Sequence, residues 1–330
     1  MKQKQDMKQK QRNTDLDFIR AVLIMLMILI HIVSFGNAYP HLKAGILSFM
    51  MPTFLIITGY LVNIEKSWKQ MGKYLLCLTL PYMIMVTGYS ILSYFMPVRD
   101  GITELSISQI CERIFVTSIG PYWFIQTMII CGALYYLSFK CIRWDGMRMG
   151  GQEHCKHNSL VAFALMLVLV SLTPALSTTA AAYYFIGVVI RQSNAEFSKI
   201  FRPSYLAIWL WALILLKEDW YNWAYIAVIF SCWCCISMLM WVRSTLSVFK
   251  LGKIDSTLLY IGRNTLPIYL FHPIFTMAAK FYHPLFSWDS SEIAFALFTV
   301  VLAIVGSIGI AKLMEMTHTA YIFGKGKILR

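Results

Sequence analysis

Two ionisable residues, Arg20 and His31, interrupt an apolar stretch near the start of the chain. They are eleven positions apart in the sequence, close to three turns of an α-helix. Both side chains therefore project from one face, about 16 Å apart along the axis. Asp17 and Ser34 extend this polar line, three residues beyond either end. Ionisable groups inside a bilayer are costly and usually face a cavity or a partner. The spacing favours a working site over an arginine that reaches the lipid headgroups and a histidine that only packs.

A second histidine, His272, lies in another apolar stretch, with Tyr269 on the same helical face by the three-residue spacing. Asn264 is a residue type typical of helix N-caps, and Pro267 fits the first turn, so a helix is expected to begin here, just after Arg263. Two histidines at similar depth predict a catalytic pair. Free imidazole, with a pKa of about 6.5, is a suitable general base for a hydroxyl group.

Two further motifs are open to a functional or a packing interpretation. Pro52 is followed by Thr58 and Gly59, where a hydroxyl beside a residue without a side chain allows a ligand or another helix to approach closely. Tyr122 and Trp123 follow a proline at an expected helix start, which is also typical of an interfacial aromatic belt. Helix packing and the belt are the simpler interpretations.

Metal and redox chemistry are not expected. His154, Cys155 and His157 lie in one loop, but no second ligand pair follows at a useful spacing. Eight cysteines form no paired framework, and the cluster at 232–235 is interpreted as small packing residues. We predict no metal and no permanently bound cofactor.

The composition predicts an all-α, polytopic membrane protein. Of the 330 residues, 58% are hydrophobic and only 14% are charged, and apolar runs of about 20 residues recur. Residues 1–14 are expected to be a disordered basic tail, and residues 15–330 a single transmembrane domain. Ten transmembrane helices are expected at roughly 16–35, 42–62, 74–95, 121–140, 159–175, 178–190, 204–216, 222–242, 264–282 and 292–314.

The distribution of basic residues orients these helices. With both termini cytoplasmic, the cytoplasmic segments hold 22 of the 29 Lys and Arg residues and the outer segments hold 5, as the positive-inside rule requires. The rule also favours a helical hairpin around Pro174. The net charge of +13 therefore arises mainly from basic residues that mark the cytoplasmic ends of the helices. This argues against nucleic-acid binding, and the lipid bilayer is the expected surrounding partner.

Together these motifs resemble acyltransferase family 3, bacterial integral-membrane O-acyltransferases, over most of the chain. Arg20 and His31 match the family's Arg-x10-His signature, and Thr58 stands where serine is usual. Residues 262–269 with His272 look most like the fucose 4-O-acetylase-like branch. An Arg-x-x-Arg pair that is common in the third span of the family is absent here. Lys73 is therefore the candidate in this span for contact with the acyl donor.

The resemblance implies a bacterial inner-membrane enzyme that transfers an acetyl or similar acyl group from cytosolic acyl-CoA to a hydroxyl of a surface glycan or its lipid-linked precursor. His31 would be the general base or a transient acyl carrier, and His272 would orient the acceptor or polarise the thioester carbonyl. The other expected roles are donor binding and support of the site: Arg20, Lys73 and Arg263 for the donor, and Asp17, Thr58, Trp123 and Tyr269 for support.

A transporter or flippase for a glycan precursor is the alternative from another class, because it would also turn polar residues inward. Transporters often show interrupted helices at corresponding positions in two halves. We find no such internal symmetry in this sequence, and a purely structural protein would leave Arg20 and both histidines unexplained.

Overall fold

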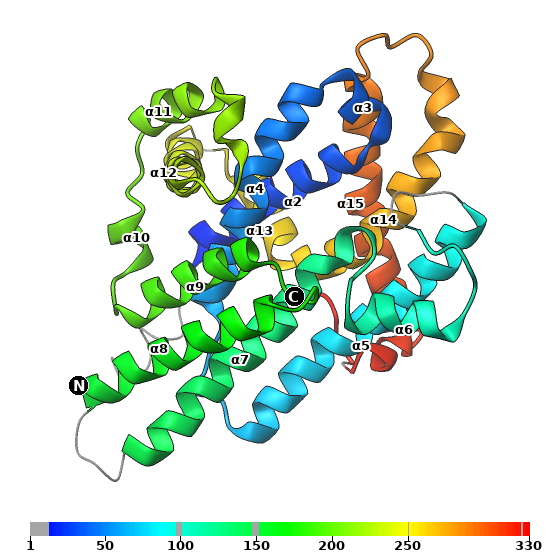
Figure 1. Cartoon of the computed structure of the whole chain (residues 1–330). Helices are drawn as coiled ribbons and strands as arrows, with labels where there is room; N and C mark the ends of the chain where they lie inside the picture. The colour runs from blue at the N-terminus through cyan, green and yellow to red at the C-terminus, as the bar shows by residue number, and fades with distance from the viewer. Residues whose placement is uncertain (1–12, 97–100, 147–151, 250, 325) are drawn as a thin grey trace.

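The computed structural model describes residues 13–330 apart from 97–100, 147–151, 250 and 325, and its described residues form helices and no strand. Figure 1 shows the helices gathered around the first one, α2 (Thr14–His31). This helix contacts α4, α12, α13, α14 and α15, from both halves of the chain. The residues with the sharpest chemical signal in the sequence therefore lie on the central helix.

Helix α2 begins and ends sharply. The Asn13 side chain accepts hydrogen bonds from the backbone N–H groups of Asp15 and Leu16, which caps the first turn. The helix therefore starts inside the predicted tail, whose residues 1–12 lie outside the described residues. At the other end Ile32 is extended (φ −79°, ψ 109°), and the chain resumes as α3 (Val33–Ala38). The expected span 16–35 thus breaks directly after His31.

Helices occur at all the other expected positions, with α8 and α9 on either side of Pro174 as predicted. Helix α6 lies in the long segment before Gly120, and α13 lies in a segment where no helix was specified. The remaining helices have these bounds: α4 Pro40–Leu61, α5 Trp68–Phe95, α6 Ile107–Phe115, η1 Gly120–Tyr122, α7 Trp123–Gly146, α8 Gln152–Ser171, α9 Thr178–Gln192, α10 Phe197–Ile200, α11 Leu206–Leu215, η2 Glu218–Tyr221, α12 Ile226–Val248, α13 Gly252–Arg263, α14 Thr265–Tyr282, η3 His283–Phe286, α15 Ile293–Met316 and η4 Thr319–Phe323.

Five segments within the described residues are long and apolar enough to cross a membrane, so the chain is an integral membrane protein. Helices α2 and α14, which carry Arg20, His31 and His272, are not among the five. Helix α11 has ten residues and is about 15 Å long, half of a bilayer core of about 30 Å. The number of ten crossings and the side of the termini stay predictions.

Glycines bring α4 and α9 into backbone contact. A Cβ added at Gly59 would lie 2.2 Å from the Tyr184 carbonyl oxygen, and one at Gly187 would lie 2.0 Å from that of Ile56. Thr58 donates its hydroxyl to the Phe54 carbonyl of its own helix, at 2.8 Å. The Thr58–Gly59 motif therefore serves packing in this structure, the simpler of its two interpretations.

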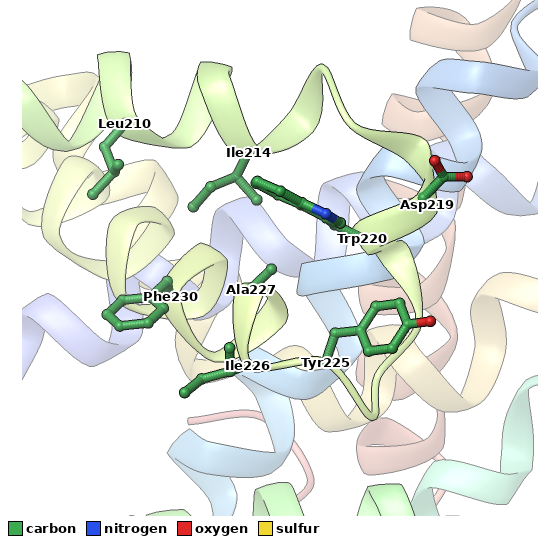
Figure 2. A pocket seen from close by; sticks show the side chains of 8 residues that line it. All are labelled: Leu210, Ile214, Asp219, Trp220, Tyr225, Ile226, Ala227 and Phe230. Atoms are coloured by element: carbon green, nitrogen blue, oxygen red, sulfur yellow. The ribbon is translucent and has the colours of Figure 1, made fainter.

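An open groove of about 700 Å³ separates α11 from α12 (Figure 2). Its lining is apolar, with Leu210 and Ile214 on one side, Phe230 on the other and Trp220 across one end. Asp219 is the single charged residue of the lining, which includes neither His31 nor His272.

Candidate active site

Helices α2 and α14 run side by side in the same direction and meet at two polar contacts. Arg20 Nη2 donates to Thr265 Oγ1 at one end, and the rings of His31 and His272 lie 5.3 Å apart, edge to face, at the other. Thr265 and His272 are seven residues apart, about two turns, so α14 presents both from one face. The shared-face spacing predicted on α2 is therefore matched by a second one on α14.

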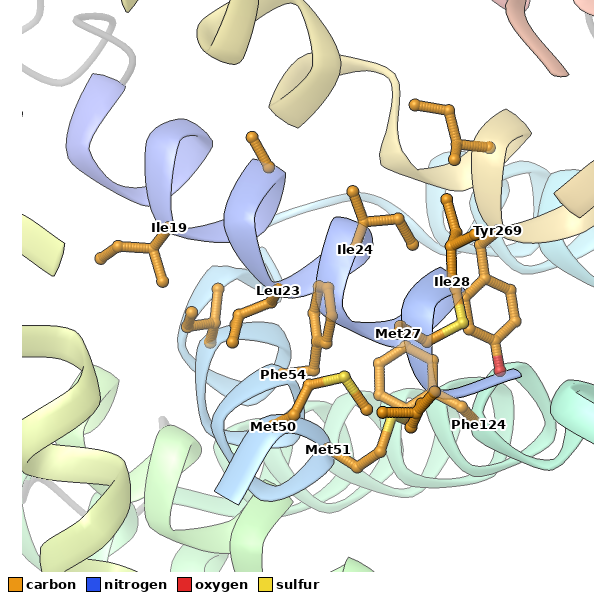
Figure 3. Packing of buried hydrophobic residues seen from close by; sticks show 14 of the residues in the cluster. Ile19, Leu23, Ile24, Met27, Ile28, Met50, Met51, Phe54, Phe124 and Tyr269 are labelled. Carbon is orange, nitrogen blue, oxygen red and sulfur yellow. The ribbon is translucent and has the colours of Figure 1, made fainter. Parts of the chain in front are cut away.

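Apolar side chains fill the space between the two polar ends. Figure 3 shows Ile24, Met27 and Ile28 of α2 packed with Phe124 and Tyr269. Because these side chains are buried, the two polar contacts are separate sites joined by a dry core.

The two histidines share one tautomer. His31 Nδ1 lies 2.6 Å from the Met27 carbonyl oxygen, and His272 Nδ1 lies 2.8 Å from that of Tyr269. A carbonyl oxygen only accepts, so in each neutral ring Nδ1 carries the proton and Nε2 carries the lone pair. His272 is fully buried, and its Nε2 has no hydrogen-bond partner in the described part of the chain. The pair therefore offers basic nitrogens with their tautomers fixed by the backbone.

Helix α14 is fastened to η1, the short helix directly before α7, beside the histidine pair. Tyr269 donates its hydroxyl to the Pro121 carbonyl, and Tyr122 donates to the Leu270 carbonyl at 3.0 Å. The ring of Tyr269 lies 5.8 Å from that of His272. An aromatic belt was the simpler interpretation of Tyr122 from sequence, but its side chain is only 1% exposed. Its partner Leu270 is far away in the chain, so no local pattern revealed the bond.

Trp123 lies on the outer side of this junction. Its ring is 6.0 Å from that of Trp223 and 6.2 Å from that of Phe124, which in turn contacts Tyr269 at 5.6 Å. Trp123 is partly exposed, whereas Phe124 is buried. An aromatic path therefore leads from the partly exposed tryptophans to the histidine pair.

At the other end, one buried carboxylate serves two arginines. Asp17 Oδ1 lies 3.8 Å from Arg20 Nη1, and Asp17 Oδ2 lies 3.7 Å from Arg263 Nε. The Asp17 side chain is 4% exposed, and that of Arg263 is 40% exposed. Arg263 Nε is nevertheless buried and has no hydrogen-bond partner among the described residues. Two guanidinium groups around one carboxylate leave an excess positive charge, which favours the binding of an anion.

Helix α13 is the element that brings Arg263 to Asp17. It packs on α2 so closely that a Cβ at Gly262 would lie 1.7 Å from the Asp17 carbonyl oxygen. Asn264 breaks the helix (φ −108°, ψ 25°) before α14 begins at Thr265. Its side chain makes no N-cap bond, in contrast to the sequence expectation, and instead donates to Tyr260 and to Arg330.

The other candidates from sequence lie elsewhere. Lys73 is exposed near the start of α5. The described residues hold no group of three potential metal ligands, and the side chains of His154 and Cys155 lie outside the described part. Cys232 contacts the Phe49 carbonyl at 3.6 Å and is buried, as a packing residue would be.

The fold and the site define a helical membrane protein with a histidine pair, of which His272 is fully buried, and an arginine cluster at the other end of two parallel helices. Residues 13–312 match the model of the acyltransferase domain, and the chain therefore belongs to acyltransferase family 3. The comparisons found no match to the chain among curated proteins or among solved structures. The protein is a membrane acyltransferase.

Proposed function

We propose that the protein transfers an acetyl group from cytosolic acetyl-CoA to a hydroxyl of a surface polysaccharide sugar or its lipid-linked precursor, in a bacterial inner membrane. The observation that carries this proposal is the contact between His31 and His272, at 5.3 Å between ring centroids. Hydroxyl acylation needs a base at the hydroxyl, and a backbone-oriented imidazole meets that need.

His31 is the proposed general base. Its Nε2 lone pair takes the proton of the sugar hydroxyl while the oxygen attacks the thioester carbonyl. The carbon–sulfur bond then breaks, and the CoA thiolate receives the proton back from the imidazolium. The Met27 carbonyl stabilises that imidazolium through Nδ1–H, at 2.6 Å.

His272 is proposed to orient the acceptor. With Nδ1–H donated to Tyr269, its Nε2 can accept a hydrogen bond from a sugar hydroxyl but cannot donate one to a carbonyl oxygen. Of the two roles expected from sequence, this tautomer supports orientation of the acceptor over polarisation of the thioester. The buried Nε2 of His272 has no hydrogen-bond partner among the described residues, and a hydrogen bond from an acceptor hydroxyl would satisfy it.

The arginine cluster is the proposed donor site. CoA carries phosphate groups, and guanidinium groups bind phosphate oxygens through paired N–H donors. Arg20 is held by Asp17 and Thr265, and Arg263 pairs with the same Asp17 through Nε. Arg20 and His31 lie about 16 Å apart along α2, so an elongated donor with its phosphates at Arg20 and its thioester at His31 would pass outside the apolar side chains packed between them.

The sugar acceptor is supported by motif. Residues 262–269 with His272 resemble the fucose 4-O-acetylase-like branch, and the pair Trp123 and Trp223 offers aromatic surface next to the site. Tyr269 holds the start of α7 in place, which keeps that surface beside the histidines.

The test is transfer of label from radiolabelled acetyl-CoA to a cell-envelope glycan fraction by protein in nanodiscs. With equal amounts of each protein and acetyl-CoA near the wild-type KM, we expect transfer by the wild type, none by His31→Ala, and strongly reduced transfer by Arg20→Ala that recovers as acetyl-CoA is raised. Label that stays on wild-type protein without acceptor, and is lost in His31→Ala, would assign the covalent acyl-histidine route. Transfer by a well-inserted His31→Ala variant would refute His31 as base and carrier alike.

A further inference from the structure

The last residues of the chain fold back onto the arginine end of the site. After η4, the red segment in Figure 1 passes α5 and returns toward the middle of the molecule. Glu315, in the last turn of α15, accepts hydrogen bonds from the backbone N–H groups of Ile328 and Leu329, both at 2.7 Å. Leu329 is 8% exposed. Residues 326–330, here named the C-terminal clasp, are thus held by a carboxylate at two successive peptide groups.

Asn264 holds the end of the clasp. The backbone N–H of Arg330 donates to Asn264 Oδ1 at 2.8 Å, and Asn264 Nδ2 donates to the main-chain oxygen of Arg330 at 3.3 Å. Nδ2 also donates to the Tyr260 carbonyl at 2.9 Å. Asn264 is fully buried, and these bonds use both of its amide N–H groups and its amide oxygen. Such complete use of a buried amide fixes the position of Arg330.

The approach to the clasp is anchored as well. The ring of Phe323 stacks on that of Phe271, with 6.0 Å between centroids and 21° between planes. Gly324 is in the left-handed region (φ 72°), and its carbonyl accepts a hydrogen bond from Cys77 Sγ at 3.3 Å. The turn at Gly324 therefore directs the chain along α5, on the face of that helix that carries Cys77.

These anchors place the clasp against the arginine cluster. Asn264 lies between Arg263, which pairs with Asp17, and Thr265, which accepts from Arg20. Lys73 is one helical turn before Cys77, so it lies on the same side of α5 as the bonded glycine. The bonds of Asn264 thus fix the backbone of Arg330 beside the segment that carries Arg263 and Thr265.

We infer that the C-terminal clasp is a wall of the donor site, in which Arg330 is a further phosphate contact and Asn264 and Glu315 are positioning residues. This inference rests on the proposed function. Arg330 is exposed, so a ligand can reach its guanidinium, while its backbone is fixed by Asn264.

The experiment measures binding of CoA itself and acetyl transfer, with full-length protein in nanodiscs. Arg330→Ala is compared with Lys327→Ala, an exposed cation of the same segment. We expect the Kd for CoA and the KM for acetyl-CoA to rise about tenfold in Arg330→Ala, because a charge-assisted bond to phosphate is lost. Lys327→Ala should change both by less than twofold, Arg330→Lys should recover part of the loss, and kcat should stay constant.

Glu315 tests the positioning role, because Glu315→Gln and Glu315→Ala both remove its charge but only Glu315→Ala removes its bonds to the clasp. Glu315→Gln keeps an oxygen that accepts both backbone N–H groups, whereas Glu315→Ala removes it. We expect Glu315→Ala to raise the KM for acetyl-CoA severalfold, with kcat constant, and Glu315→Gln to behave like the wild type.

The outcomes separate this inference from the proposed function. If the wild type and Arg330→Ala bind CoA with the same Kd, the inference is overturned and the proposed function is unaffected. Wild-type protein that binds no CoA would overturn both the inference and the proposed donor. If Arg330→Ala and Lys327→Ala raise the Kd for CoA and the KM for acetyl-CoA equally, the effect is one of overall positive charge, and a specific contact of Arg330 with phosphate is refuted.

Discussion

The two ends of the α2–α14 contact differ in how their polar groups are satisfied. At the arginine end, Asp17, Arg20, Thr265 and Arg263 hold one another, and the clasp closes over them. At the histidine end each ring makes one bond to its own helix, and the outward nitrogen of His272 has no partner in the described chain.

This difference separates binding from reaction. A site binds a charged group more tightly when neighbouring residues already hold its side chains in place, because less conformational freedom is then lost on binding. A base must instead present a lone pair that no protein group occupies. We therefore expect substitutions at the arginine end to act mainly on KM for the donor, and substitutions at the histidine end to act mainly on kcat.

The sharpest way to break this comparison is at His31. His31→Ala should lower kcat by about 10³-fold, since removal of a general base typically costs about 10²- to 10⁴-fold. The Kd for CoA should remain within about twofold of the wild type, because the arginine end is unchanged. A large loss of CoA binding in this variant, measured by equilibrium titration, would show that the two ends do not act separately.

His272 sharpens the comparison through its two nitrogens. His272→Asn preserves a donor near the position of Nδ1 and removes Nε2, whereas His272→Gln can place an amide oxygen near Nε2. We expect a loss of about 10²-fold in kcat/KM for the acceptor with Asn and a smaller loss with Gln, if orientation of the hydroxyl is the role. Initial rates at varied acceptor concentration measure this. Equal losses in both variants would favour a packing role for the ring.

Arg20 tests the opposite end. Arg20→Lys keeps the charge but loses the planar fork that reaches both Asp17 and Thr265, so KM for acetyl-CoA should rise about tenfold, and Arg20→Gln should raise it further. In both variants kcat should stay within about threefold. If kcat instead fell as far as in His31→Ala, Arg20 would belong to the chemical step.

The smallest effect is expected from Gly262, which acts through geometry. Gly262→Ala places a Cβ 1.7 Å from the Asp17 carbonyl oxygen, so α13 must move away, at a cost of about 1–3 kcal/mol. We expect a lower melting temperature and a severalfold higher KM for acetyl-CoA. Gly252→Ala, in the same helix with no atom within 4 Å of the added Cβ, is the matched control. Identical behaviour of the two variants would mean that α13 does not position Arg263.

Much of the site could be predicted because it is encoded by local spacing. The eleven residues from Arg20 to His31 and the three from Tyr269 to His272 follow from helix geometry, and Asp17 beside Arg20 follows from the same rule. The helix positions follow from apolar runs that exclude water and must satisfy their own backbone groups. The break after His31 was not predicted, because apolar residues continue through Val33 and give no signal for it.

By itself, the sequence determined that this is a helical membrane protein and which helices carry ionisable groups, since hydropathy and helical period are properties of neighbouring residues. Only the tertiary structure decided which of those groups meet. The pairing of His31 with His272, the contact of Asp17 with Arg263, and the bonds of Asn264 to Arg330 join residues 66 to 246 positions apart. Such contacts depend on how helices cross and on glycines that let backbones touch, and no local pattern encodes either.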